Sequence, residues 1–345
     1  MKLEVSERLF VESLFQESIS AKKIEEQTII ETNRLTGDAS TRRYYRVRTD
    51  KNSYVVCLGN ALEKNSNLKN EFIEVQQAWK KYDILVPEVY DYKLDKGYIL
   101  EEDLGDITFL KHLSKKTSKE SQYLSYEKVI DELIKIHSID PKKHYQNTFT
   151  KLSFDYSKFM YEVDFCIEWF VEKLIGVSIS DSRVKALRKQ FEIVCEKISK
   201  EHTVVTHRDF HSRNIMVRDD DIRIIDFQDA RLGLPQYDLV SVLEDCYYEL
   251  DRENVYKLKS YYWEKFLKAK KIQPNFEHFE HLYQLMTIQR SFKAIGSFAY
   301  IYKTRNDERY LKYIGFGFEK IKKISLKVPE LNKLCHLISD IYYEY

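Results

Sequence analysis

The segment from His207 to Asn214 restricts the fold and the chemistry of this chain more than any other feature. Seven of its eight residues are polar, with Phe210 the exception. Apolar runs flank it, Val-Val-Thr at 204–206 and Ile-Met-Val at 215–217. Short runs of this composition predict strands. The polar residues therefore fall in a loop between two strands, which presents their side chains from a rigid base.

A second polar group begins twelve residues after Asn214. The run at 221–227 predicts the return strand of a hairpin, and it ends in Asp226-Phe227. Asp209, Asn214 and Asp226 thus have the order and spacing of the protein-kinase signature H-R-D-L-x-x-x-N followed by D-F-G. Asn214 and Asp226 offer the oxygen ligands that Mg²⁺ prefers, so we predict a metal site there. Asp209 is then free to accept the proton of an attacking hydroxyl group, which makes it the predicted catalytic base.

The neighbouring polar residues receive supporting or binding roles. We expect His207 and Arg208 to hold the loop backbone and its aspartates rather than to react. His211 faces either the substrate or the packing of the loop itself, and the sequence leaves both readings open. The predicted acceptor contacts, chosen because they lie near the transfer site along the chain, are Arg213, Gln228 and Asp229.

Strand patterns dominate the first hundred residues, and helix patterns dominate the remainder. Five apolar runs between residues 29 and 102 predict strands. We therefore predict a sheet-rich domain over residues 1–102 and a larger, mostly helical domain over residues 103–345, with a ligand cleft at their junction. Helical periodicity is found at residues 1–26, 66–82, 123–138, 154–175 and 184–198, and from 237 onward.

Glycine is scarce, with nine in 345 residues, and this excludes familiar nucleotide-binding loops. No two glycines have the spacing of G-x-x-x-x-G-K-[ST], and no G-x-G-x-x-G is present, so neither a P-loop nor a Rossmann fingerprint exists. A nucleotide must be held by another kind of loop. The formal net charge of +1 argues against binding to nucleic acid or to a membrane surface by bulk electrostatics.

Cysteine usage and hydropathy indicate the compartment. The five cysteines form no C-x-x-C pair, which favours a reducing environment. The N-terminal stretch carries acidic residues within its apolar part, unlike a signal peptide, and no uncharged apolar run approaches 18 residues. We expect a cytoplasmic protein with a small-molecule substrate and no obligate protein partner. The sequence does not define the oligomeric state.

Over roughly residues 30–315 the chain resembles the kinase-like phosphotransferases of the aminoglycoside phosphotransferase and choline kinase type. Within that family it is most similar to the anomeric kinases of N-acetylmuramate and N-acetylglucosamine from bacterial cell-wall recycling. The resemblance implies an α+β, bilobal protein-kinase-like fold, with a small antiparallel-sheet N-lobe and a larger, mostly helical C-lobe. The matching segments are 37–46, 102–106, 206–217, 225–233, 235–243 and 289–298.

The same resemblance implies ATP as co-substrate and Mg²⁺ as metal, and it places the nucleotide. Residues 37–41 become the turn over the ATP phosphates, and residues 101–103 become the hinge whose backbone meets adenine. Asp238 becomes a buried structural aspartate that braces the catalytic loop. The ATP contacts implied in this way are Gly37, Ser40, Thr41, Glu101, Glu102 and Asp103.

Two residues of the kinase pattern are missing from this chain, the Lys of the third strand and the glycine of D-F-G. The strand at 53–58 has no Lys to meet the α- and β-phosphates. We predict that Arg42 or Arg46, on the preceding strand, contacts phosphate or Glu71 of the following helix, because a guanidinium pairs well with both. A solvated strand face is the alternative. Gln228 stands in place of the D-F-G glycine, and we expect it to point at substrate or at metal-bound water.

These features predict an ATP- and Mg²⁺-dependent sugar kinase. Asp209 would deprotonate or orient the 1-hydroxyl of N-acetylmuramate or N-acetylglucosamine, giving the α-1-phosphate, and a lactyl carboxylate on the acceptor would suit Arg213. Two alternatives stay open. The acceptor could be an aminoglycoside, choline or another small hydroxyl compound, although the mixed charge of the late helices argues against a polycation. The chain could also be a non-catalytic pseudokinase binding module, although the intact Asp209, Asn214 and Asp226 argue against this.

Overall fold

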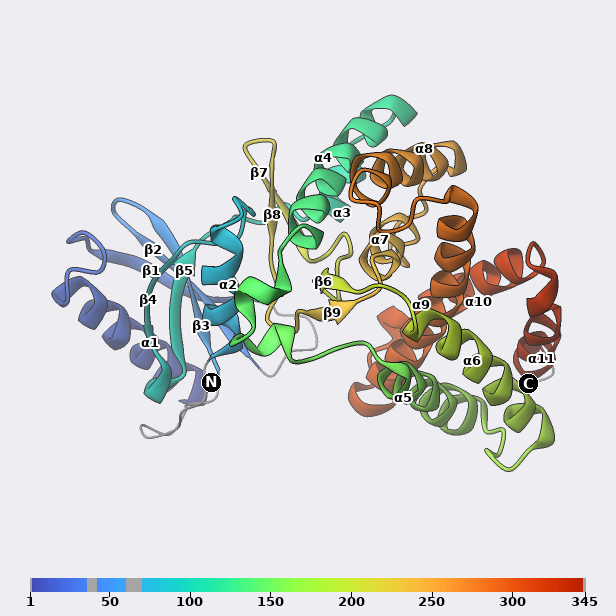
Figure 1. The fold of residues 1–345 in the computed structure, drawn as a ribbon. Coiled ribbons are helices and arrows are strands. Elements are labelled where there is room, and N and C mark those ends of the chain that lie inside the picture. Colours follow the sequence, from blue (N-terminus) through green and yellow to red (C-terminus); the bar gives the residue numbers. More distant parts are fainter. Residues whose placement is uncertain (1, 36–41, 60–69, 344–345) are drawn as a thin grey trace.

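The protein folds into two lobes, with the short strands of the polar loop between them (Figure 1). The computed structural model describes residues 2–35, 42–59 and 70–343. The predicted α+β, two-lobe architecture is confirmed. The N-lobe elements are α1 (Lys2–Ser20), β1 (Ile29–Leu35), β2 (Arg43–Thr49), β3 (Ser53–Leu58), α2 (Glu71–Lys80), β4 (Val89–Lys93) and β5 (Tyr98–Glu102).

The N-lobe sheet is antiparallel, with the strand order β1-β2-β3-β5-β4. Its two faces are covered differently, because successive side chains of a strand point to opposite faces. On β3, Val56 belongs to the apolar cluster that includes Leu14 and Phe15 of α1, whereas Cys57, on the opposite face, belongs to the cluster that includes Trp79 of α2. The face that carries Cys57 is therefore the one directed toward α2 and the C-lobe.

The N-lobe helices are shorter than the sequence predicts. Helix α1 ends at Ser20 instead of residue 26, because Lys22 adopts a left-handed φ of 56° and the chain turns there. Helix α2 begins at Glu71, where the Asn70 side chain caps it by accepting the N–H of Ile73 at 3.2 Å, and it ends at Lys80 instead of residue 82. Residues 66–69 of the predicted helix lie outside the described residues. The strands at 29–35 and 53–58 lie where the periodicity predicts them.

The C-lobe is mostly helical and holds two small ladders. Strand β6 (Val204–Thr206) pairs with β9 (Arg231–Gly233), and β7 (Ile215–Arg218) pairs with β8 (Asp221–Ile224). The helices are α3 (Phe109–Leu113), α4 (Lys119–His137), α5 (Tyr156–Cys166) with its π-helical continuation η4 (Ile167–Ile175), α6 (Ser182–Ser199), α7 (Gln236–Leu243), α8 (Arg252–Tyr262) with η5 (Trp263–Lys268), α9 (Phe276–Arg305), α10 (Lys312–Ser325) and α11 (Asn332–Tyr343).

Helix α9 is the central element of the C-lobe. It has 30 residues and contacts α5, α6, α7 and α10. Gly296 lies where α9 meets the end of α5, and a Cβ added there would lie 2.6 Å from the Cα of Cys166. Only glycine fits so close an approach. This contact fixes the position of α9 along its own axis.

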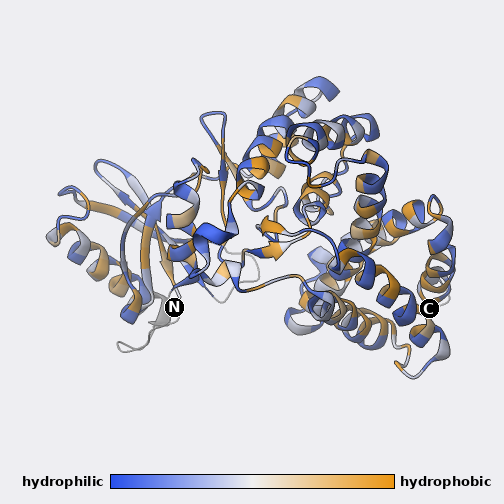
Figure 2. Cartoon of the chain, viewed as in Figure 1, coloured by the Kyte–Doolittle hydropathy of each residue, from blue (hydrophilic) through white to orange (hydrophobic). Residues whose placement is uncertain are grey.

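Apolar contacts join the loop to the N-lobe. Phe227 stacks on Phe72 of α2, with ring centroids 4.8 Å apart, and lies 5.5 Å from the ring of Trp79. Figure 2 shows apolar residues at β6, beside the lobe junction, and hydrophilic residues at the tip of the β7–β8 hairpin. In the described part of the chain, no helix combines the length and the apolar character needed to cross a membrane.

Candidate active site

Two buried carboxylates of the C-lobe hold the backbone of the predicted catalytic loop, residues 207–214. Asp238 of α7 is fully buried and accepts the backbone N–H groups of His207 at 2.6 Å and of Arg208 at 3.0 Å. Asp245, just beyond α7, accepts the N–H of Ser212 at 2.9 Å. Hydrogen bonds to an ionised carboxylate are stronger than neutral ones. The loop is therefore anchored on both sides of Asp209, and Asp238 has the placement that its predicted bracing role requires.

The side chains of His207 and Arg208 point to structural partners. His207 Nε2 donates to the carbonyl oxygen of Ile225, 2.9 Å away, and so ties the loop to the end of β8. Arg208 Nη1 lies 2.6 Å from Asp229 Oδ2. Asp229, which was predicted as an acceptor contact, is therefore engaged by a residue of the loop in this structure.

Asn214 brings the three predicted transfer residues together. Its Nδ2 donates to the main-chain oxygen of Asp209 at 3.0 Å and to Asp226 Oδ2 at 3.2 Å. Asp226 has a left-handed φ of 63°, which marks the turn after β8. Gln228 Nε2 donates to Asp226 Oδ1, so Gln228 contacts the predicted metal ligand.

The charges around Asp226 fit a bound cation. The surrounding protein desolvates its carboxylate and raises its pKa, and the negative charge of Asp209 raises it further. A divalent cation held by Asp226 and the Asn214 amide oxygen would offset that repulsion. In the ranges that the structure describes, no three His, Cys, Asp or Glu side chains form a metal site on their own. That arrangement suits Mg²⁺, which takes one or two carboxylates and completes its shell with phosphate and water.

Asp209 is surrounded by cations. Arg290 Nη2 and Lys293 Nζ each lie 3.2 Å from its Oδ1, and Arg208 Nε lies 3.8 Å from its Oδ2. Burial alone would raise the pKa of Asp209, but these cations, Lys293 foremost, hold it well below its usual range. The carboxylate is therefore ionised at neutral pH. It is a weak base and a strong hydrogen-bond acceptor, suited to orienting a hydroxyl group.

The sequence predicted neither Arg290 nor Lys293 as a site residue. Both lie in the 289–298 segment of α9, which sequence reasoning used only for its family resemblance. Their spacing of three places both on one helix face, within a run of apolar and small residues. Charged residues are almost never fully buried unless they are paired. Two bases in a buried helix were the available signal that an acid faces them.

A cavity of about 160 Å³ opens beside Asp209, between α7 and α9. Burial lowers the pKa of His211 in its wall to about 4, so this ring is neutral. Arg213 stacks on the lining residue Tyr247, with its guanidinium 4.8 Å from the ring centroid, and its Nη1 lies 3.5 Å from the hydroxyl of Tyr310. The other lining residues include Ser241, Asp245, Cys246, Ser297 and Phe298.

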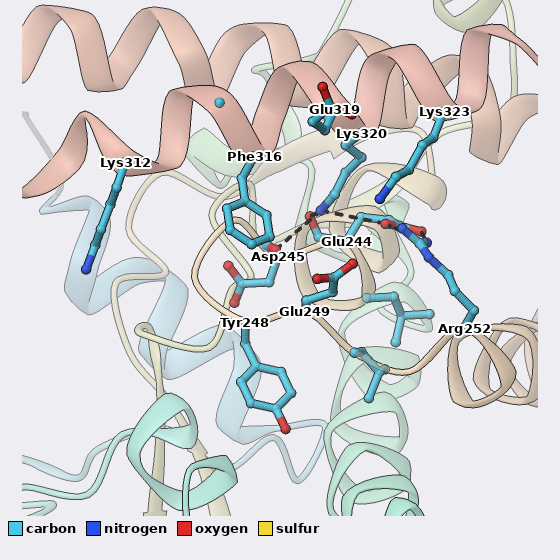
Figure 3. A pocket seen from close by; sticks show the side chains of 13 residues that line it. Glu244, Asp245, Tyr248, Glu249, Arg252, Lys312, Phe316, Glu319, Lys320 and Lys323 are labelled. Carbon is cyan, nitrogen blue, oxygen red and sulfur yellow. Dashed lines mark hydrogen bonds and ion pairs between the residues drawn. The ribbon is translucent and has the colours of Figure 1, made fainter.

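A second pocket, of about 390 Å³, lies behind the same wall (Figure 3). Glu244 and Asp245 line both spaces. From α10, Lys320 points toward them and donates to the carbonyl oxygens of both, while Arg252 lies 2.8 Å from Glu244 Oε1. Helix α10 thus supports the segment that holds the catalytic loop.

Ion pairs organise residues 102–106, which include part of the predicted hinge for the nucleotide. Arg46 of β2 lies 2.8 Å from Asp103 Oδ2 and 2.9 Å from Asp106 Oδ1. Arg218 of β7 reaches Glu102 at 2.8 Å and the carbonyl oxygen of Asp103 at 3.0 Å. Among the described residues, Arg46 is therefore paired with the hinge and not with Glu71, which is exposed in the first turn of α2.

Glu101 lies on the same face of the sheet as Cys57, the face directed toward α2. The register places Arg46, Val55 and Glu101 in one row across β2, β3 and β5. Burial raises the pKa of Glu101 to about 8, and the positive charge of Arg42 acts against this rise. Arg42 also interacts electrostatically with Asp226. Gly37, Ser40 and Thr41 of the predicted phosphate turn lie outside the described residues.

The chain matches known proteins along most of its length. The profile of the phosphotransferase enzyme family matches residues 31–269. An N-acetylmuramate/N-acetylglucosamine kinase of Neisseria meningitidis serogroup B is 28% identical over 306 residues, 88% of each chain. A protein of the same name from Pseudomonas putida is 26% identical over 307 residues, which cover 89% of this chain and 87% of that one.

Solved structures share the fold at lower sequence identity. The choline kinase LicA of Streptococcus pneumoniae superposes with a TM-score of 0.58 at 14% identity, over 94% of this chain and 99% of that one. The ADP-bound aminoglycoside phosphotransferase APH(2'')-Ib superposes with a TM-score of 0.53 at 17% identity, over 96% and 98% of the two chains. These similarities establish a common two-lobe architecture.

Proposed function

Because this chain belongs to the phosphotransferase enzyme family, we propose that it is an ATP-dependent kinase acting on the anomeric hydroxyl of N-acetylmuramate or N-acetylglucosamine. The observation that carries the proposal is the position of Asp209. It lines the cavity between α7 and α9, and Asn214 joins its backbone to Asp226. An acceptor hydroxyl in the cavity would thus approach a phosphoryl group held on the Asp226 side. The relatives that carry this substrate in their names align over most of both chains.

The chemistry follows from the loop geometry. The acceptor oxygen attacks the γ-phosphorus of ATP, the bond from that phosphorus to the β,γ-bridging oxygen breaks, and ADP leaves. Asp209 orients the hydroxyl and receives its proton as the transfer proceeds. Asn214 and Asp226 would hold Mg²⁺, which supplies neutralisation of phosphate charge. Asp238 and Asp245 keep the loop in place throughout, because they bind its backbone.

The charges of the cavity bear on the choice of acceptor. Two bases, Arg290 and Lys293, share its wall with three acids, and Arg213 stacks on the lining residue Tyr247. Because these bases and acids nearly cancel, the wall offers no strongly acidic surface for a polycationic aminoglycoside. A lactyl carboxylate would pair well with Arg213. A non-catalytic binding module would have no need for the hydrogen-bonded set of Asp209, Asn214 and Asp226.

The test is to incubate the protein with Mg²⁺-ATP and each candidate acceptor and to follow ADP release and the phosphorus NMR spectrum of the product. We expect sugar-dependent turnover and an anomeric phosphate. Asp209→Asn should lower kcat by about 10²- to 10⁴-fold, the usual contribution of a positioned acid or base. Turnover with choline or kanamycin alone would refute the proposed acceptor, and ATP binding without turnover would favour the binding module.

Arg213 provides a test of the acceptor itself. Arg213→Leu should raise KM for N-acetylmuramate by about 10- to 100-fold, because a hydrogen bond to a charged group contributes about 1.5–3 kcal/mol. KM for N-acetylglucosamine, which lacks the carboxylate, should change by less than about threefold by the same argument. The matched control is Arg183→Leu, which removes an arginine paired with Asp181 at the start of α6. Equal losses for both sugars would remove Arg213 from acceptor recognition.

A further inference from the structure

We propose that Lys293 is a second cation of the transfer centre, which contacts the transferred phosphoryl group, whereas Arg290 only positions Asp209. The inference rests on the proposed kinase function and adds a catalytic residue from α9. The two side chains share one acceptor atom, Asp209 Oδ1, at the same distance of 3.2 Å. Their remaining surroundings differ, and that difference separates their roles.

Arg290 is committed to protein partners. Its Nε donates to Ser241 Oγ at 2.8 Å, and its guanidinium stacks over the ring of Tyr237, 5.1 Å from the centroid. Its Nη2 donates to Asp209 Oδ1 at 3.2 Å and to the carbonyl oxygen of Arg208 at 3.5 Å. A planar fork held at several points is rigid. Arg290 therefore fixes one oxygen of Asp209 in the free enzyme and throughout the reaction.

Lys293 has a less constrained position. It lies one helical turn farther along the same face of α9 and lines the cavity with Asp209. In the described part of the chain, its ammonium forms an ion pair with Asp209 alone. An ammonium on a flexible four-carbon stem has three donors. One donor satisfies Asp209, and the others are available to an anion that enters the cavity.

The reaction itself would change the partner of Lys293. As the acceptor oxygen bonds to phosphorus, its proton passes to Asp209, which loses its negative charge. The oxygens of the transferring phosphoryl group then become the nearest anion to the ammonium. Cations placed on this group raise the rate strongly in other phosphotransferases, by about 10³- to 10⁵-fold for an arginine finger. The described strand β3 supplies no Lys to neutralise phosphate charge. Lys293, from the opposite lobe, would supply a cation for that purpose.

The experiment compares Lys293→Met, Lys293→Arg and wild type, with kcat and KM measured separately. We expect Lys293→Met to lower kcat by about 10²- to 10³-fold, the loss seen when one charge-stabilising donor is removed, with KM for the sugar within about threefold. The kcat of Lys293→Arg should be at least tenfold higher than that of Lys293→Met, because the arginine keeps the positive charge. The matched control is Lys259→Met, because the Lys259 side chain is similarly shielded, at 9% exposed against 16% for Lys293, but pairs with Glu280 at 2.5 Å, outside the cavity.

Binding of a transition-state analogue separates a catalytic role from a structural one. With the sugar present, wild type should bind Mg²⁺-ADP with aluminium fluoride more tightly than Mg²⁺-ADP, and Lys293→Met should lose that gain while it keeps Mg²⁺-ADP binding. If wild type is active and the folded Lys293→Met variant keeps both its kcat and its analogue binding, the inference about Lys293 is overturned and the proposed function is not. A wild type without turnover on any acceptor would overturn the proposed function as well.

Discussion

The predicted catalytic loop, residues 207–214, and the predicted hinge, residues 101–103, are held by different forces. The loop is fixed through its backbone, whose N–H groups donate to Asp238 and Asp245 from the C-lobe core. The hinge is fixed through side chains, by Arg46 on Asp103 and by Arg218 on Glu102. A backbone anchor does not depend on the identity of the loop side chains. The loop can therefore carry reactive groups, whereas the hinge uses its own charged groups for support.

The energies of the two arrangements differ as well. Asp238 is fully buried, and its loss would leave two backbone donors without acceptors. At the hinge, Arg218 and Glu102 are partly exposed, with 45% and 19% of their side-chain surface accessible, whereas Arg46 and Asp103 are 17% and 9% exposed. Exposed ion pairs contribute about 0–1 kcal/mol, whereas a buried unsatisfied donor costs about 1–3 kcal/mol. Substitutions in the loop anchor should affect stability and kcat, and those in the hinge should mainly affect ATP binding.

The largest effect is expected for Asp238→Ala. Two backbone donors lose their acceptor, so the free energy of unfolding should fall by about 2–5 kcal/mol, and kcat should fall as the loop loses its anchor. Urea denaturation and steady-state kinetics measure the two effects. The control is Asp220→Asn at the exposed hairpin turn, where Asn tolerates the positive φ of 62°. A loop that keeps full activity in the Ala variant would contradict the anchoring role of Asp238.

A smaller effect is expected for the pH dependence of stability through Glu101. Its pKa is about 8 in the folded protein and 4.5 in the reference state, so the folded state binds more protons between these values. The contribution of Glu101 to stability is thus complete below pH 4.5 and is lost as pH rises through about 8. The slope from this residue is at most about 1.4 kcal/mol per pH unit.

Glu101→Gln should remove that slope. Chemical denaturation of wild type and variant at several pH values between 5 and 8 measures the difference. Wild type should lose stability relative to the variant as pH rises. Glu102→Gln, one residue away and paired with Arg218, is the matched control. Parallel pH profiles for wild type and Glu101→Gln would show that Glu101 titrates normally.

The smallest effect is expected at the hinge ion pair. Arg46→Met and Asp103→Asn should each raise KM for ATP several-fold with little change in kcat. If the pairing seen between them is their main role, the double variant should resemble the single ones, with a coupling of about 0.5–3 kcal/mol for residues in contact. Additive losses would instead mean that Arg46 binds ATP independently, as the sequence suggested.

Local features were predictable, and long-range pairings were not. The loop and its hairpin lie within about twenty residues, so strand patterns and spacing located Asp209, Asn214 and Asp226 together. Arg46 and Asp103 are 57 residues apart, and their contact depends on how β2, β3 and β5 align. A period-two pattern assigns a residue to a face of a sheet but not to a partner. Strand β9, with only three residues, gave no periodic signal.

The two bases of α9 that contact Asp209, Arg290 and Lys293, were not predicted from the sequence. The helix is covered by neighbours on several sides, so its apolar residues do not form a single stripe that would point to one buried face. The roles of Arg290 and Lys293 become visible only when α9 is placed against the catalytic loop. Asp229 is a different case, because nearness along the chain predicts an acceptor contact and the structure shows its pairing with Arg208; the acceptor contact stays a prediction.

The close approach of α9 and α5 at Gly296 determines where the side chains of the neighbouring turn of α9 lie. One helical turn before this glycine, Lys293 faces Asp209, so the spacing between α9 and α5 sets where the ammonium stands. A methyl group at residue 296 would meet the backbone of Cys166 and push the helices apart. Phosphoryl transfer tolerates little misplacement of its charged groups. Gly296 lies outside the proposed site, yet it would influence the position of Lys293 relative to Asp209. A larger side chain at residue 296 should therefore lower kcat before it unfolds the lobe.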